Sequence, residues 1–158
     1  MTSVRSVLVL AICLGTVAAA AALGGYATSL GVGEWYRTLD KPAWNPPDWV
    51  FGPVWTLLYI LMAAAAWLVL TKGWRSAKPA LALFFLQLIL NAAWSWLFFG
   101  LRQPGWAFAE LLALLAATVT TAVLFARVSP VAAWMLVPYI AWVAFAGMLN
   151  FTIWRLNG

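Results

Sequence analysis

The sequence predicts an all-α integral membrane protein: a bundle of five transmembrane helices with one long loop, rich in Trp and Pro, between the first two helices. Of its 158 residues, 66% are hydrophobic and only 8% are charged, which excludes an ordinary soluble domain. The charged residues are also sorted along the chain, so that long uncharged stretches lie between them. A helix needs about 20 apolar residues to cross the hydrocarbon layer, and these stretches are long enough.

The spacing of the charges alone predicts four spans. These spans lie between Arg5 and Glu34, between Asp48 and Lys72, between Lys78 and Arg102, and between Arg127 and Arg155. A fifth span is apolar except for Glu110, which lies about one turn from the helix start, where a carboxylate can reach the interface. We therefore predict helices over residues 4–26, 50–70, 80–99, 106–126 and 131–154, in a single domain that covers residues 1–158.

The first span also resembles a secretory signal. Arg5 precedes an Ala-rich run, with several A-x-A cleavage sequences between Ala18 and Ala22. However, the apolar run over residues 7–23 is longer than a usual signal core of about 7 to 15 residues, and the other spans already require membrane insertion. We therefore assign this segment as the first transmembrane helix.

The net charge of +5 does not indicate a nucleic-acid partner, because the basic residues stand singly or in short loops beside the spans and form no continuous stripe. They are better interpreted as topology signals. One face of the membrane would carry Arg5, Lys72, Arg75, Lys78 and Arg127, and the other Arg37, Lys41, Arg102 and Arg155. The first face would carry five basic residues and the second face four, and this small excess favours an N-terminus on the inner side of the membrane. The short connections before residues 106 and 131 predict antiparallel neighbouring helices, and Pro79, Pro104 and Pro130 indicate helix starts.

The long loop, residues 29–49, is aromatic and stiff. It contains Trp35, Tyr36, Trp44 and Trp49 together with Pro42, Pro46 and Pro47. Prolines restrict themselves and the residues before them, so we expect an extended, folded-over shape. Two interpretations stay open: an aromatic belt that anchors helix ends at the headgroups, or a lid that closes the mouth of the bundle.

Aromatic and polar residues recur at helical spacing in the later spans. The stripes are Gln87, Asn91, Trp94, Ser95 and Phe98; Trp55, Tyr59, Met62 and Ala66; and Pro138, Trp142, Ala146 and Leu149. Such stripes can be plain packing, with Gln87 and Asn91 bonding across helices. Indoles and amides beside small residues also provide flat faces, hydrogen-bond groups and space, so we predict a Trp-lined pocket for a flat hydrophobic ligand.

The sequence lacks the usual catalytic sets. It has no histidine, and its four acidic residues lie mostly in the long loop. His-containing metal sites, His-based triads and paired-carboxylate hydrolysis are therefore excluded, and we predict no metal site and no required cofactor. The single cysteine, Cys13, lies in the first span and cannot form an intrachain disulfide.

Several sequence blocks carry a resemblance to a known family. They are Trp35-Tyr36, Lys41-Pro42-Ala43-Trp44-Asn45-Pro46-Pro47, Gly52-Pro53-Val54-Trp55, Leu90-Asn91-Ala92-Ala93-Trp94, Gly105-Trp106, Pro138-Tyr139-Ile140-Ala141-Trp142 and Leu149-Asn150-Phe151-Thr152-Ile153-Trp154-Arg155. In this order they resemble the TspO/MBR family of tryptophan-rich sensory proteins, also called translocator proteins or peripheral benzodiazepine receptors. The match runs over residues 34–155, and the first helix fits by position only.

The resemblance implies a five-helix homodimer, a multi-pass protein expected in the bacterial cell envelope, that acts as a receptor or carrier in porphyrin or oxidative-stress sensing or transport. It implies binding of tetrapyrroles such as protoporphyrin IX and heme, of isoquinoline and benzodiazepine drugs and, in animal members, of cholesterol. The residues that match the family's pocket are Tyr36, Pro46, Trp55, Asn91, Trp94, Trp106, Ala109, Trp142, Ala146 and Leu149.

Two details of the resemblance bear on function. Some bacterial members are reported to degrade protoporphyrin in light, which would make Trp55 and Trp142 the catalytic residues and leaves open whether this chain is an enzyme. The proposed cholesterol motif would occupy residues 149–155, but its tyrosine position is Phe151. The missing hydroxyl weakens the case for sterol binding.

Overall fold

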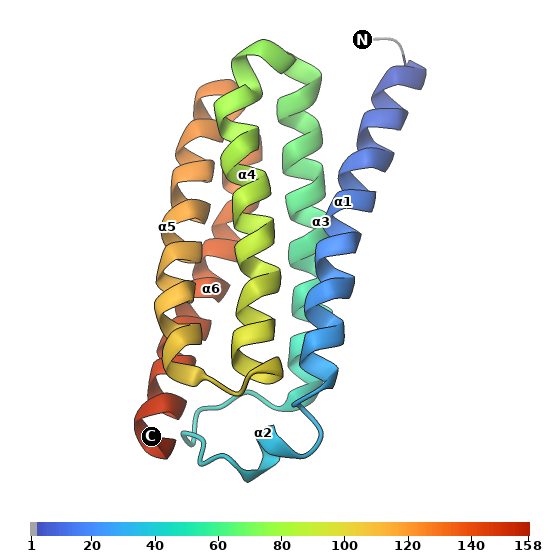
Figure 1. Cartoon of the computed structure of the whole chain (residues 1–158). Helices are drawn as coiled ribbons and strands as arrows, with labels where there is room; N and C mark the ends of the chain where they lie inside the picture. The colour runs from blue at the N-terminus through green and yellow to red at the C-terminus, as the bar shows by residue number, and fades with distance from the viewer. Residues whose placement is uncertain (1–2) are drawn as a thin grey trace.

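The computed structural model describes residues 3–158, with side chains for residues 4–73 and 77–158. The long helices are α1 (Ser3–Ser29), α3 (Asp48–Lys72), α4 (Trp74–Ser95), α5 (Pro104–Val128) and α6 (Pro130–Asn157). A π-helical segment, Trp96–Gly100, continues α4, and a single helical turn, α2 (Trp35–Thr38), lies in the long loop. Five helices are long and apolar enough to cross a membrane, which confirms the predicted transmembrane bundle (Figure 1).

The five long helices close into a ring in the order α1, α3, α6, α5, α4, because each contacts the next and α4 contacts α1. The predicted antiparallel pairs α4–α5 and α5–α6 are confirmed, because the helices of each pair are in contact and run in opposite directions (Figure 1). Large side chains such as Phe84, Phe125 and Tyr139 fill the interior of the ring. Apolar side chains such as Ile12 and Val123 point outward, as lipid contact requires.

The helix ends differ from the prediction in a consistent way. Each helix extends past its apolar stretch, so that α3 begins at Asp48 and α6 continues to Asn157, because polar ends of a span can stay helical outside the hydrocarbon layer. Pro104 and Pro130 are the first residues of α5 and α6, as predicted. Pro79, by contrast, lies inside α4, which begins at Trp74, so its use as a helix start was wrong. The chain reverses before it at Gly73, whose φ of 144° suits glycine.

The loop between α1 and α3 folds across one end of the ring, at the end where α6 also finishes (Figure 1). We predicted an extended shape for this segment, and the structure adds the turn α2 to it. The loop leaves α1 through Gly31, where an added Cβ would lie 2.5 Å from the Phe99 carbonyl oxygen. Only glycine allows this close approach between the loop and the π-helical segment.

Candidate functional site: a tryptophan-lined cavity

A cavity of about 320 Å³ lies among α1, α3, α4 and α6, beneath the loop that carries α2. This volume is in the usual range for small-molecule sites, roughly 300–1,000 Å³. Its wall along α1 consists of Ala21, Gly24, Gly25 and Thr28, the first three of which are small. An added Cβ on Gly24 would lie 3.3 Å from Ser95 Oγ, so the glycine lets α1 approach α4 closely and keeps this wall flat.

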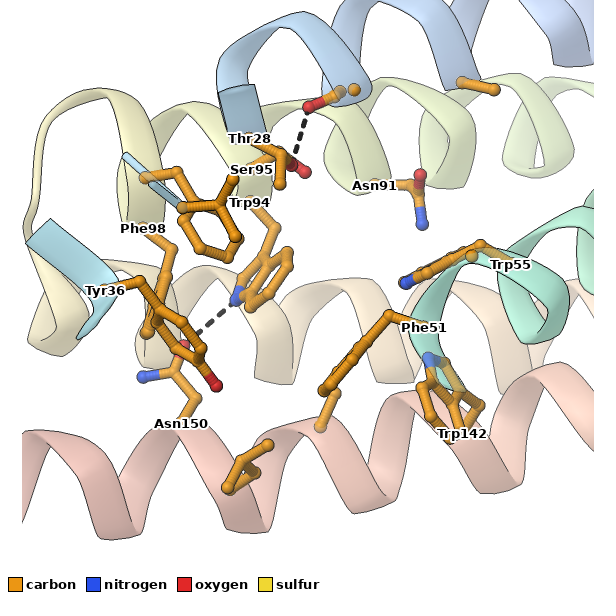
Figure 2. Close-up of a pocket in the computed structure, with 18 of the residues that line it drawn as sticks. Thr28, Tyr36, Phe51, Trp55, Asn91, Trp94, Ser95, Phe98, Trp142 and Asn150 are labelled. Atoms are coloured by element: carbon orange, nitrogen blue, oxygen red, sulfur yellow. Dashed lines mark hydrogen bonds between the residues drawn. The ribbon is translucent and has the colours of Figure 1, made fainter. Parts of the chain in front are cut away.

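Aromatic rings form the opposite boundary of the cavity. Figure 2 shows Phe51 and Trp55 of α3 gathered with Trp142 of α6 on one side. The Phe51 ring meets Trp142 edge-on at 5.8 Å, and Trp55 stacks on Tyr59 with ring centroids 5.4 Å apart. Neither the Trp55 nor the Trp142 indole N–H takes part in a hydrogen bond among the described side chains. The two donors are therefore available to a ligand.

Asn91 supplies the central polar group and joins three helices. The Tyr59 hydroxyl donates to Asn91 Oδ1 (2.7 Å), and Asn91 Nδ2 donates to the Tyr139 hydroxyl oxygen (3.0 Å). The side chain thus bonds across helices and also lines the cavity, so both interpretations of this residue apply. Gln87 has a different place: its Nε2 donates to the sulfur of Met62 (3.7 Å), and it does not line the cavity.

Trp94 is held in place by a second amide. The Trp94 indole donates to Asn150 Oδ1 (3.0 Å), and Asn150 Nδ2 donates to the Pro104 carbonyl oxygen (2.7 Å). This fixes the Trp94 ring, which stacks on Phe98 with centroids 5.3 Å apart and faces the cavity (Figure 2). Asn150, on α6, therefore positions the Trp94 ring of α4 in the cavity wall. Its second hydrogen bond, to Pro104, connects α5 to both of these helices.

The loop closes the cavity with Tyr36. This side chain is buried, with 7% of its surface exposed, and its hydroxyl donates to Asn45 Oδ1 (3.0 Å). Burial and the nearby Asp48 raise the pKa of the Tyr36 phenol, and the hydrogen bond to Asn45 partly offsets this rise. The phenol therefore stays protonated and remains a hydrogen-bond donor at neutral pH.

Two further contacts fasten the loop. Lys41 Nζ donates to the carbonyl oxygens of Tyr36 (2.7 Å) and Leu39 (2.9 Å) and lies 4.8 Å from the centre of the Tyr36 ring. The Asp40 backbone N–H donates to Asn157 Oδ1, and Asn157 Nδ2 donates to the Asp40 carbonyl oxygen, both at 2.8 Å. These bonds tie the loop to itself and to the last turn of α6.

The two interpretations of the loop apply to different residues. Tyr36 is buried over the cavity and Trp35 packs edge-on against Phe98 at 5.5 Å, which gives these residues the position of a lid. Trp49, at the start of α3, is 74% exposed, as expected of a residue in an interfacial belt. The loop therefore combines a lid with an outward-facing aromatic residue.

The structure brings most of the predicted site residues together and leaves three apart. Tyr36, Trp55, Asn91, Trp94, Trp142, Ala146 and Leu149 all line the cavity. Pro46 lies in the loop, where its carbonyl oxygen accepts a hydrogen bond from Asn45, but it does not line the cavity. Trp106 and Ala109 line a separate surface depression beside Trp154. They face away from the others because the inward position on this turn of α5 belongs to Ala107, which is fully buried.

Several lining residues were missed by sequence reasoning, above all Asn150, Phe51 and Phe145. A signal for Asn150 was present, because it follows Trp142 and Ala146 at a spacing of four and is an amide within an apolar span. The small residues of α1 carried no such signal, since nothing in their pattern marks which of them faces α4.

Comparison with known proteins shows the family to which the chain belongs. A sequence profile described as the TspO/MBR family matches residues 11–155. The Tryptophan-rich protein TspO of Chlorobaculum tepidum is 44% identical over 155 residues, which is 97% of this chain and 98% of that protein. The human Translocator protein is 47% identical over 127 residues, covering 78% of this chain and 75% of its own length, and Protein CrtK of Rhodobacter capsulatus is 38% identical over 88% of each chain. The chain is therefore a membrane protein of the TspO/MBR family.

Proposed function

We propose that this membrane protein binds tetrapyrroles, such as protoporphyrin IX and heme, and similar flat hydrophobic ligands in its cavity, with a role in sensing or transporting porphyrins under oxidative stress. The observation that carries the proposal is the shape of the cavity. Phe51, Trp55 and Trp142 lie on one side of it, and Tyr36, Trp94 and Phe98 lie on the other (Figure 2). A flat aromatic ligand between these groups can contact rings on both sides.

The polar groups support the same ligand class. They are few and separated, with the indole N–H groups of Trp55 and Trp142 and the Asn91 amide set among apolar side chains. A ligand with a large apolar body and occasional acceptor atoms matches such a site. The lid, formed by Trp35 and Tyr36, would cover a bound ligand. Rigid aromatic side chains lose little conformational entropy when ligand binding fixes them.

Binding is tested by titrating the purified protein with protoporphyrin IX in a non-ionic detergent, in the dark, while tryptophan fluorescence is followed. We expect saturable quenching at micromolar ligand. Replacing Trp142→Phe together with Asn91→Ala should weaken binding about tenfold, roughly 1.4 kcal/mol, because a ring contact and a cavity amide are lost. Trp142→Phe alone keeps the Tyr59–Asn91–Tyr139 bonds and is expected to weaken binding by a smaller factor.

The matched control is Trp106→Phe, which removes an indole that is 70% exposed outside the cavity and should leave the affinity unchanged. Free tryptophan and an unrelated membrane protein report non-specific quenching. Quenching that never saturates, or an equal loss of affinity in the Trp106 and Trp142 variants, would contradict the proposal.

Light-dependent porphyrin degradation is a second candidate, favoured by the position of Trp55 and Trp142 on the same side of the cavity with their N–H groups unpartnered. A photoexcited porphyrin can take one electron from a neighbouring indole and pass it to dissolved dioxygen, which becomes superoxide. The indole radical cation then takes one electron from the porphyrin and is restored, and the porphyrin radical cation combines with superoxide, so that the net reaction adds dioxygen to the macrocycle. This chemistry needs no acid or base.

Under illumination in air we expect the Soret absorbance of the bound porphyrin to decay. In the double variant Trp55→Phe and Trp142→Phe, the decay should fall to the rate of porphyrin in empty micelles. Samples kept dark or free of oxygen serve as controls. Decay at the wild-type rate in the double variant, measured at saturating porphyrin, would remove this candidate and leave the binding proposal intact.

A further inference from the structure

The loop that covers the cavity is joined to the last turn of α6 by one side chain, Asn157. Its Oδ1 accepts a hydrogen bond from the Asp40 backbone N–H, and its Nδ2 donates to the Asp40 carbonyl oxygen, both at 2.8 Å. Nδ2 also donates to the Ile153 carbonyl oxygen of α6, at 2.8 Å. The amide therefore uses its oxygen and both of its N–H groups, which fixes its orientation between helix and loop.

This pair of bonds is the directional link between the loop and the later helices. Among the described residues, no other hydrogen bond joins residues 30–47 to α4, α5, α6 or the π-helical segment. The loop also contacts these elements through aromatic rings, such as Trp44 with Phe145 (5.9 Å) and Tyr36 with Phe99 (5.6 Å). Apolar contacts are not directional, so the amide of Asn157 determines where the loop is fastened.

The fastening at Asp40 extends to Tyr36, which closes the cavity. Lys41 Nζ donates to the carbonyl oxygens of Tyr36 (2.7 Å) and Leu39 (2.9 Å), so residues 36–41 are held together as one unit. Asp40 belongs to this unit. While Asp40 is bonded to α6, Tyr36 is therefore kept over the cavity, and when these bonds open the whole unit can move away.

The link is separate from the ligand-contacting surface. Neither Asp40 nor Asn157 lines the cavity, and both residues are exposed. Water competes for exposed hydrogen bonds, so breaking two of them costs little. Separating α3 from α6, or α1 from α4, would instead break packing contacts along the helices. The loop is therefore the part of the cavity wall that opens most easily.

We propose that Asn157 is a positioning residue that acts as a latch: its bonds to Asp40 hold the lid closed, and ligand enters and leaves the cavity when they open. This inference rests on the proposed function and concerns the route and rate of ligand exchange. Because the latch does not touch the ligand, its loss shifts the balance of open and closed lid alike with and without ligand. Both rate constants should then rise by one factor, about three- to tenfold, and Kd should change by less than about twofold.

The test measures protoporphyrin IX exchange by stopped flow, in the dark and at one concentration of a non-ionic detergent. Tryptophan quenching reports association, and excess apomyoglobin captures released porphyrin to report dissociation. Asn157→Leu removes both bonds to Asp40 and keeps the number and branching of the side-chain heavy atoms. We expect both rate constants to rise about three- to tenfold, with Kd unchanged in the equilibrium titration. Asn157→Ala is a second variant, and thermal unfolding checks the fold of each.

Thr38→Val is the matched control. The Thr38 hydroxyl is exposed and donates to the Trp35 carbonyl oxygen (2.8 Å) within the same loop, so its loss leaves the link to α6 intact. Asp40→Ala tests the geometry of the latch, because Asn157 bonds only the backbone of Asp40. Both variants should exchange porphyrin at the wild-type rates.

Hydrogen–deuterium exchange without porphyrin supplies a readout that does not depend on binding. Asn157 Oδ1 accepts the Asp40 N–H, so peptides over residues 36–47 should exchange faster in Asn157→Leu than in wild type or Thr38→Val. Peptides from the middle of α6 should exchange as in wild type.

Wild-type exchange rates of porphyrin in Asn157→Leu would overturn the inference, since ligand would then pass between the helices. Faster dissociation alone, with weaker Kd, would also overturn it, because Asn157 would then shape the bound state and not the opening of the lid. Equal acceleration in Asp40→Ala would count against a backbone latch. If porphyrin does not bind saturably to wild type, the proposed function fails, while hydrogen exchange in the loop still decides whether Asn157 fastens it.

Discussion

Replacing Asn150 with leucine should lower the free energy of unfolding by about 2–4 kcal/mol, because two partly buried polar groups lose their partner at once. Asn150 is 1% exposed, and it accepts a hydrogen bond from the Trp94 indole while donating to the Pro104 carbonyl oxygen. Leucine has the same number of side-chain heavy atoms, branched at the same position, but can do neither. Each group left unpaired in a low-dielectric interior costs about 1–3 kcal/mol, less where it finds another partner. Thermal unfolding in detergent, followed by circular dichroism, measures the loss.

Thr152→Val is the matched control for this change. The Thr152 hydroxyl donates only to the Met148 carbonyl oxygen of its own helix, at 2.8 Å, and is not buried. Its removal should change the stability by no more than about 0.5 kcal/mol. If Asn150→Leu unfolds at the temperature of Thr152→Val, then the three-helix junction at Asn150 does not stabilise the bundle.

Replacing Gly31 with alanine should displace the lid. The added Cβ would lie 2.5 Å from the Phe99 carbonyl oxygen, which is a backbone atom and cannot rotate away as a side chain would. Relief requires the loop or the π-helical segment to shift, at a cost of about 1–3 kcal/mol. Because the Gly31 carbonyl also accepts a hydrogen bond from the Tyr36 N–H (2.9 Å), the shift moves Tyr36 from the cavity. We expect protoporphyrin affinity to fall at least about tenfold in the dark titration.

Gly33→Ala, two residues further along the same loop, tests whether this effect arises from the close contact. An added Cβ on Gly33 meets nothing within 4 Å, so the same chemical change should leave affinity and melting temperature near the wild-type values. Equal behaviour of the two alanine variants would show that contact with Phe99 does not position the lid.

The transmembrane spans could be predicted because burying a charge in hydrocarbon is costly, so the places where charges stop and resume mark each crossing. The ends could not be predicted as closely, since Asp48 and Asn157 remain helical without being apolar. The turn α2 and the π-helical segment are short elements that tertiary contacts create. The Tyr36–Asn45 hydrogen bond and the approach of Gly31 to Phe99 are examples of such contacts.

The cavity was predictable where helical periodicity alone determines which way a side chain faces. Asn91 and Trp94 share one face of α4, and Trp142 shares a face of α6 with Ala146. These residues line the same cavity once the two helices lie beside it. Periodicity does not fix the rotation of a helix about its axis. For that reason periodicity could not check the assignment of Trp106 and Ala109 to the pocket, which came from the resemblance to the family. The structure turns both residues outward.

The bonds at Asn91 and Asn150 also bear on how selective the cavity can be. Each of these amides already has a partner for its oxygen and for one N–H before any ligand arrives, and Trp94 has its partner too. These amides are therefore preorganised, and a ligand that meets them breaks none of these internal bonds. Among the described lining side chains, polar discrimination rests mainly on the indole N–H groups of Trp55 and Trp142, which have no partner. The thickness and flatness of a planar ligand should then matter more than its polar groups in determining whether it fits the cavity.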